Sequence, residues 1–364
     1  MSVLPRFTPS RLALAILCLS PQLQANDNAI EHIQVSATRS SAPVSTVPAT
    51  ISVITQEQIA NQLVFTQDIS AIIGNLLPGF SPSRQKLTSA GETLRGREPL
   101  YMIDGVPQSN PLRNGSRDGK TIDPAMIERI EVIRGANAIQ GMGASGGIIN
   151  IVTKSASDDT HQLSASFTSP TNGGSDSQSY KASYLQTYRN KDLAVVAGLA
   201  ISENAMYRDA NGDFIGVDGT QGDTMDSRSI DVFFKARHQL SEDESLQLMV
   251  NHYKLKGNGD YVQVAGNVTE GKPATSVRGE TDGMAPQNKV TTATLDYQHQ
   301  AVFGGSISWQ LFLQDFAALY GGGTFAAFQD PVYGPDLYDQ SQNKSRKYGS
   351  RLTWFKPKIG RAHV

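Results

Sequence analysis

The residues that could carry catalytic chemistry are few and scattered. The sequence holds six histidines and one cysteine, and no spacing places several metal ligands together or a nucleophile beside a base. Residues 141–146 match the Gly-x-Gly-x-x-Gly nucleotide fingerprint, but the apolar run 148–152 that follows reads as a strand, whereas this fingerprint must open a helix. We therefore expect a protein that is not an enzyme and has no resident metal or cofactor.

The charge balance argues against a nucleic-acid partner. Lys and Arg number 32 against 34 Asp and Glu, which gives a formal net charge of −2. A nucleic-acid binder needs a basic face that displaces counterions from the phosphates. The mean hydropathy of −0.31 gives no sign of membrane helices. A β-barrel escapes that test, because only alternate residues of its strands face lipid.

Residues 1–25 predict a secretory signal peptide. Arg6 and Arg11 precede the apolar run 12–19, and Ala25 offers a small residue for cleavage. The run is much shorter than the roughly 20 residues that a membrane-spanning helix needs; a buried N-terminal helix is the alternative. The single cysteine, Cys18, lies in this segment, so the mature chain is expected to have no thiol and no disulfide.

Short mixed elements are expected up to about residue 154. Thr55-Gln56-Glu57-Gln58 resembles a capping box that opens a helix, and residues 68–76 predict a second helix, which Leu77-Pro78-Gly79 stops. Asp104-Gly105 lies between apolar residues and is a strong hairpin signal. Three further runs predict strands, the last of them buried on both faces: residues 47–54, 130–132 and 148–153.

From about residue 161 the pattern changes to long alternating strands, each with one apolar and one polar face. The connections between the strands alternate in length as well. The connections at 189–192 and 241–244 have four residues each, whereas the segments 203–227 and 257–289 are long and polar. Short turns at one end and long loops at the other favour an outer-membrane barrel over a soluble β-sandwich. About eight strands fit into the sequence.

Five motifs occur in order between residues 77 and 154, and together they closely resemble the plug domain of TonB-dependent outer-membrane receptors. Ala136 is one departure, since the family usually has proline there. The motifs are Leu77-Pro78-Gly79-Phe80, Leu94-Arg95-Gly96-Arg97, Tyr101-Met102-Ile103-Asp104-Gly105-Val106-Pro107, Ile127-Glu128-Arg129-Ile130-Glu131-Val132-Ile133-Arg134-Gly135 and Gly146-Gly147-Ile148-Ile149-Asn150-Ile151-Val152-Thr153-Lys154.

This resemblance implies an α+β plug domain followed by a transmembrane antiparallel β-barrel of about 22 strands, whose lumen the plug fills. Plug arginines pair with barrel glutamates in the family. The candidates for plug–barrel contacts here are Arg95, Glu128, Arg129, Glu131 and Arg134. The alternative for each is an ordinary solvated strand charge.

The segment 31–37 resembles the TonB box, an extended stretch near the mature N-terminus that pairs edge-on with its partner. The residues assigned to it are Ile33, Gln34, Val35, Ser36 and Ala37. Gln34 departs from the usual aliphatic residue, and an ordinary first strand of the plug is the alternative. The resemblance implies TonB, with ExbB and ExbD, as partners.

The implied function is import of a ferric siderophore by a monomer that lies in outer-membrane lipid of a Gram-negative bacterium. Residues 84–93 and 108–121 are expected to form the plug apex, where Arg84, Arg97, Arg113 and Arg117 are candidate ligand contacts. A siderophore is favoured because residues 114–119 resemble those of ferric-siderophore receptors. Haem, cobalamin or another nutrient is one alternative, and a surface barrel without transport, such as an adhesin or phage receptor, is another.

The expected domain boundaries are 1–25 for the signal peptide, 26–45 for the TonB-box segment, 46–155 for the plug and 160–358 for the N-terminal part of a barrel. Residues 359–364 match one reading frame of a common sequencing adapter, so they are expected to be a non-native tail. An incomplete barrel would leave unpaired strand edges, which lipid does not tolerate.

Overall fold

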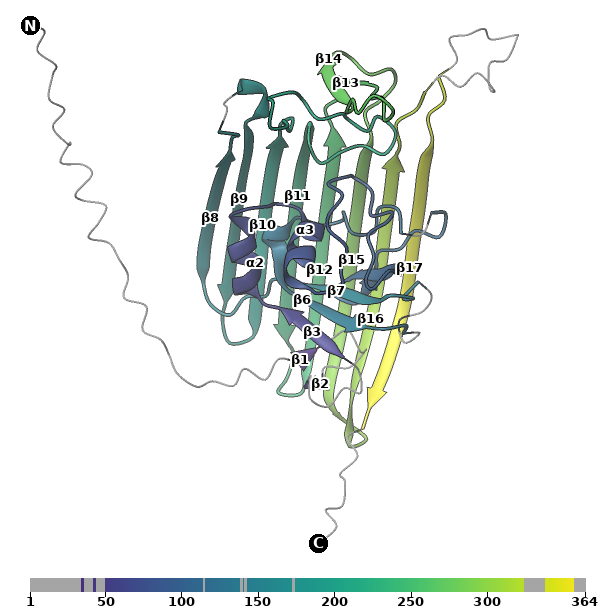
Figure 1. Cartoon of the computed structure of the whole chain (residues 1–364). Coiled ribbons are helices and arrows are strands. Elements are labelled where there is room, and N and C mark those ends of the chain that lie inside the picture. The colour runs from purple at the N-terminus through teal and green to yellow at the C-terminus, as the bar shows by residue number, and fades with distance from the viewer. Residues whose placement is uncertain are drawn as a thin grey trace, which may run out of the picture. The chain divides into compact units, whose positions relative to one another are not determined.

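The computed structural model describes residues 34–35, 42–43, 50–113, 115–137, 140, 143–171, 174–323 and 338–356. All of them belong to one compact unit, Gln34–Val364. The expected signal peptide, Ile33, Ser36, Ala37 and the expected tail lie outside the described residues. The described part comprises a five-stranded mixed sheet with two helices, an eight-stranded antiparallel sheet and two small hairpins (Figure 1).

The five-stranded sheet follows the order β3-β6-β7-β4-β5. Only β4 and β7 run parallel, and the other neighbours are antiparallel. All seven residues of β7 are buried, which confirms the two-sided burial expected from its apolar run. The strands are β3 (Ile51–Ile54), β4 (Pro99–Ile103), β5 (Val106–Pro107), β6 (Ile127–Arg134) and β7 (Gly147–Thr153). Of the TonB-box residues, Gln34 and Val35 form β1 (Gln34–Val35), which pairs with β2 (Ala42–Pro43).

Two short helices begin at the caps that the sequence predicts. Thr55 and Gln58 form a complete capping box at the start of α2 (Gln56–Leu63). Asp68 caps α3 (Ile69–Leu76) by accepting a hydrogen bond from the Ser70 amide. Both helices contribute isoleucines to the core, and Ile59 and Ile73 are buried there beside Ile130 of β6.

Two tight turns shape the loops of this domain. Asp104 and Gly105 have φ of 44° and 81° and join β4 to β5, which confirms the predicted hairpin. Arg95 and Gly96 have φ of 54° and 77° in a second turn of the same kind, where Leu94 bridges Arg97. Glycine at position 96 indicates a turn or a close backbone approach, and the structure has a turn there.

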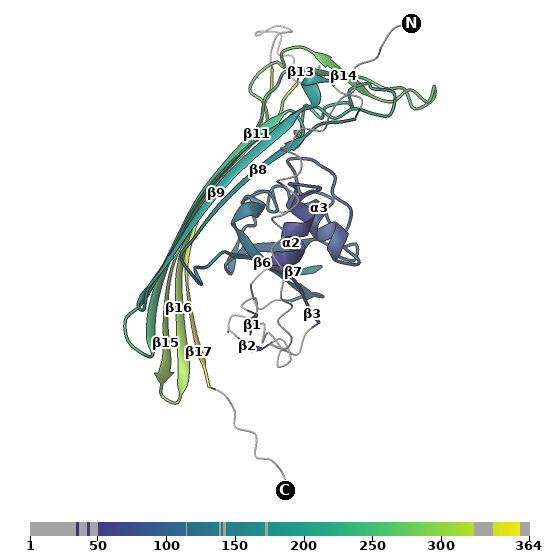
Figure 2. The same cartoon turned by 90° about the vertical axis from the view of Figure 1, so that its left-hand side faces the viewer.

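The eight-stranded sheet has the order β17-β16-β15-β12-β11-β10-β9-β8, and every neighbouring pair is antiparallel. Figure 2 shows it as one curved layer of long strands. These strands are β8 (Thr160–Thr168), β9 (Ser179–Arg189), β10 (Leu193–Asn204), β11 (Ser227–Gln239), β12 (Glu244–Gly257), β15 (Gln287–Val302), β16 (Gly305–Leu319) and β17 (Gln342–Phe355). The predicted alternation, the number of strands and the short turns are confirmed.

One expected loop contains structure of its own. The segment between β12 and β15 holds the hairpin β13 (Tyr261–Val264) and β14 (Thr275–Arg278). Short 3-10 turns, η3 (Pro124–Met126) and η4 (Ser175–Ser177), also lie between strands. None of the helices among the described residues is long and apolar enough to cross a membrane.

The two faces of the large sheet differ in their surroundings. Leu199, Val232 and Leu248 point to one face and are more than 40% exposed. Their neighbours Val196, Phe233 and Met249 point to the other face, where they are buried in the same apolar cluster as the isoleucines of the plug. The small sheet and one face of the large sheet therefore share a core.

Candidate ligand site and plug–sheet contacts

The four candidate ligand arginines lie in two loops, between α3 and β4 and between β5 and η3. Arg84, Arg97 and Arg113 are exposed. Arg84 donates a hydrogen bond from Nη1 to the Ala90 carbonyl (2.6 Å) within its own loop. Arg117 differs from the other three, because its side chain is 0% exposed.

Arg113 and Arg117 come together at Tyr320, which directly follows β16. Their guanidinium carbons lie 4.6 and 4.4 Å from the centroid of the Tyr320 ring, within the range of cation–π attraction. Ser116 fixes the ring, since its Oγ and the tyrosine hydroxyl lie 2.6 Å apart. The structure thus places two cations against one aromatic ring where the plug meets the large sheet.

The charge on Arg117 is poorly compensated by the described residues. Its Nη2 lies 3.5 Å from the Leu319 carbonyl, while Nε and Nη1 have no hydrogen-bond partner within the described part of the chain. Burial lowers the pKa of this guanidinium, and the Tyr320 hydroxyl opposes that shift. A buried cation with free donors is costly unless an anion or another polar group meets it.

Asp118 is buried next to this arginine. One of its carboxylate oxygens accepts a hydrogen bond from the Gly115 amide (3.2 Å), and the other has no partner among the described residues. Burial raises the pKa of Asp118 to about 6.

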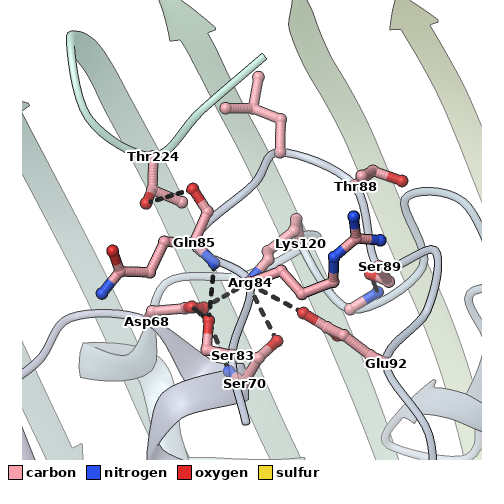
Figure 3. Close-up of polar contacts among 12 residues, drawn as sticks. Asp68, Ser70, Ser83, Arg84, Gln85, Thr88, Ser89, Glu92, Lys120 and Thr224 are labelled. Atoms are coloured by element: carbon pink, nitrogen blue, oxygen red, sulfur yellow. Dashed lines mark hydrogen bonds and ion pairs between the residues drawn. The ribbon is translucent and has the colours of Figure 1, made fainter. Parts of the chain in front are cut away.

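A second charged cluster lies beside residues 84–93 (the apex loop) and includes Lys120, which is buried (Figure 3). Its ammonium group is ion-paired with Asp68, lies 3.7 Å from a Glu92 oxygen and donates to the Ser70 hydroxyl (3.0 Å). Tyr101 in β4 donates its hydroxyl hydrogen to Glu92 (3.0 Å). The cluster therefore joins the start of α3, the apex loop, the 115–123 loop and β4.

The pKa values in this cluster follow from its charges. Burial acts to raise the pKa of Asp68, but the ammonium of Lys120 outweighs it and the pKa is lowered. Burial acts to lower the pKa of Lys120, but Asp68 and Glu92 outweigh it and the pKa is raised. The pair is therefore held in its charged form.

The apex loop is also bonded to the segment between β10 and β11. Lys86 forms an ion pair with Asp223. The Thr224 amide donates to the Gln85 carbonyl (2.9 Å), and the Leu87 amide donates to the Gly222 carbonyl (2.9 Å). Figure 3 shows Gln85 beside Thr224. Movement of either segment must break these backbone bonds or carry the other segment along.

Where the plug forms ion pairs with the described strands of the large sheet, the strands supply the cations. Lys235 of β11 lies 3.2 Å from Asp104 and 2.9 Å from the Thr153 hydroxyl. Lys181 of β9 pairs with Asp123 at 2.6 Å. Plug carbonyls accept from two further cations, Lys347 and Arg351 of β17. The family pattern of plug arginines and barrel glutamates implies the opposite polarity.

The five residues predicted for plug–barrel contacts lie elsewhere. Arg129 pairs with Glu128 and Glu131 on β6, both at 2.8 Å. Glu131 is buried, and its second oxygen accepts from Asn150 of β7 (3.1 Å). Arg95 is exposed in its tight turn, and Arg134 ends β6. The structure gives none of the five an ion pair with the described strands of the large sheet, so their role in such contacts stays a prediction.

Sequence reasoning missed the acids and lysines that do join the two sheets. Asp104 was predicted only as part of its turn, and Lys235 lies on the polar face that is expected of an alternating strand. An inward-facing lysine among polar neighbours was the available signal, because such a charge needs a partner once that face is covered. No group of histidines, cysteines and carboxylates suited to a metal occurs among the described residues.

Comparison with known proteins decides the family. Residues 43–148 match the family model described as the TonB-dependent receptor plug domain. Residues 43–148 therefore belong to the TonB-dependent receptor plug-domain family. The plug-domain match covers four of the five strands of the small sheet, both helices and both arginine loops, and it ends within β7. The predicted fold class, plug followed by barrel strands, is thereby confirmed.

The similar proteins include siderophore receptors. The chain is 30% identical over 330 residues to the rhizobactin receptor of Rhizobium meliloti (strain 1021), covering 88% of this chain and 44% of that protein. It is 27% identical over 363 residues to the ferric aerobactin receptor of Klebsiella pneumoniae, covering 97% and 48%. The chain thus spans about half the length of the curated relatives it matches.

Solved structures share the fold. A crystal structure of the ferric enterobactin receptor of Pseudomonas aeruginosa has a TM-score of 0.60 at 19% identity, over 87% of this chain and 47% of that one. At this identity the likeness concerns the fold alone.

Proposed function

We propose that this chain forms the plug and part of the barrel of an outer-membrane receptor that imports a ferric siderophore. The observation that carries the proposal is the pair of guanidinium groups at Tyr320, one exposed and one buried with free donors. Ferric siderophores present anionic or electronegative oxygens, which arginine recognises through charge-assisted hydrogen bonds. The rhizobactin and aerobactin receptors similar to nearly the whole chain support this ligand class.

Arg113 is the first contact in this proposal, and Arg117 holds Tyr320 in place from its buried side. Arg84 and Arg97 lie on exposed loops and widen the cationic surface. The plug ion pairs and the bonds between the apex loop and residues 222–224 keep these loops in position before ligand arrives. Preorganisation of this kind lowers the entropic cost of binding.

Energy coupling is the second part of the proposal. TonB engages the N-terminal segment 33–37 by adding its own strand to it. The short strand β1 supports an extended backbone at Gln34 and Val35. ExbB and ExbD act with TonB at the inner membrane, and the receptor works as a monomer in the outer-membrane lipid.

The ligand step is tested by titrating the refolded 364-residue chain in detergent with ferric aerobactin and measuring quenching of its intrinsic fluorescence. Arg113→Gln should weaken binding about tenfold or more, because one hydrogen bond to a charged group is lost. Lys191→Gln, in the exposed turn between β9 and β10, is the matched control and should bind normally. Equal binding by both variants would remove Arg113 from the site, and absence of saturable binding by the parent chain would refute the siderophore assignment.

A further inference from the structure

The exposed face of the large sheet carries a groove whose lining changes from apolar to cationic across the strands β8 to β12. The cavity has a volume of about 730 Å³. Cross-strand partners arrange its outward residues in two adjacent rows. The first row is Ala165, Ala182, Ile201, Ile230 and Lys254, and the second is Phe167, Tyr180, Glu203, Arg228 and Lys256.

The apolar part of the groove is open. Phe167 and Tyr180 pack their rings 5.3 Å apart, between centroids, and form one wall. Ile201 and Ile230 lie beside them and are 48% and 40% exposed. Exposed apolar side chains that form one continuous surface indicate contact with an apolar partner.

The cationic part of the groove lies beside the apolar residues Ile201 and Ile230, which form its floor. Arg228 pairs in register with Lys256, and Lys254 pairs with Lys289 of the next strand. Among the described residues these four cations form no ion pair, in contrast to Arg346 of β17, which pairs with Asp315 at 2.6 Å. The one acid in the groove, Glu203, accepts a hydrogen bond from Asn258 (2.7 Å). The groove thus has a surplus of positive charge.

We propose that the groove binds an anionic phospholipid of the membrane. An acyl chain lies on Ile201 and Ile230 against the aromatic wall, and the phosphate lies among Arg228, Lys254 and Lys256. A soluble anion would leave the apolar floor uncovered, whereas an uncharged lipid would leave the cations without a partner. The inference rests on the proposed function in one respect, that this face of the sheet is turned to the bilayer.

The experiment measures lipid retained by the refolded 364-residue chain. The chain is equilibrated in detergent with phosphatidylglycerol or phosphatidylcholine, separated from free micelles, and assayed for bound phosphorus. The parent chain should retain phosphatidylglycerol in preference. Lys254→Gln/Lys256→Gln should weaken that retention roughly tenfold or more, since each basic residue near an anionic lipid surface contributes about 1 kcal/mol.

The matched control is Lys191→Gln/Lys272→Gln, which removes two exposed lysines outside the groove and should retain lipid like the parent. Circular dichroism establishes that all variants keep their strands. Equal retention of both lipids, or unchanged retention by Lys254→Gln/Lys256→Gln, would overturn the proposal. Ferric aerobactin binding is measured on the same samples, so a failed lipid site with intact ligand binding is told apart from failure of the proposed function.

Discussion

Asp118 shows how one buried acid at the plug apex sets a pH dependence. Its pKa of about 6 in the folded chain lies above the unfolded value near 3.8. The folded state therefore holds this proton more tightly, and the contribution of Asp118 to stability falls as pH rises from about 4 to about 6. Asp118→Asn should remove this penalty and raise the free energy of unfolding by up to about 3 kcal/mol at pH 7.5.

The check is urea unfolding of parent and variant at pH 7.5 and at pH 4.5. The advantage of the asparagine should shrink to about 1 kcal/mol at the lower pH, where Asp118 is about one-sixth protonated in the unfolded state and mostly protonated in the folded state. A difference that stays constant between the two pH values would show that packing, and not the proton, accounts for it.

At the level of single residues, little of the site was predictable from the sequence. The four arginines were found as cations in loops. The burial of Arg117 was not predictable, because it depends on Tyr320, about 200 positions further along the chain at the end of β16. Lys120 was missed altogether. The sequence that flanks Lys120 does not indicate that Asp68 and Glu92 surround it, because these three residues meet only after α3 and the apex loop have packed.

The helices and strands of the plug were better predicted than its side-chain contacts. The buried cluster at Lys120 explains how these elements are held together. Lys120→Met should destabilise the chain by about 3–5 kcal/mol, because Asp68 and Glu92 would remain buried without a counter-charge. Adding Asp68→Asn and Glu92→Gln should restore much of this loss, because the charges disappear together. Thermal unfolding of the single and triple variants checks this, and a triple variant no more stable than the single one would contradict it.

Local signals account for the elements that were predicted correctly. The capping box at Thr55, the Asp104-Gly105 hairpin and the apolar run of β7 each act within a few residues of sequence. Gly96 indicates a turn or a close backbone approach but not the positive φ of Arg95, and the hairpin β13–β14 was not predicted. Arg95 adopts a positive φ that arginine seldom takes, and β13 and β14 are only four residues long each.

At the scale of the whole molecule, the plug is joined to the large sheet by lysines of the sheet and acids of the plug. Lys181→Met/Lys235→Met should loosen that junction while the plug stays folded, because Asp104 keeps its bonds to Thr153. Limited proteolysis should then cleave the connection 154–159 about tenfold faster. Arg346→Met, which breaks the exposed pair with Asp315, serves as control, since such pairs contribute little. Unchanged cleavage in the double variant would show that the apolar core alone holds the plug.

The register of the large sheet has a consequence for where each strand sits in depth. The cross-strand row that is apolar at Ile201 on β10 and Ile230 on β11 becomes charged at Lys254 on β12 and Lys289 on β15. The apolar band therefore crosses the strands obliquely. In a bilayer the strands must tilt until this band is parallel to the plane of the membrane. The register of each hairpin therefore sets the depth at which its strands lie in the bilayer. A two-residue insertion within β16 would shift the residues that follow it by about 6.6 Å along β15, and would move its aromatic and charged side chains out of line with those of the neighbouring strands.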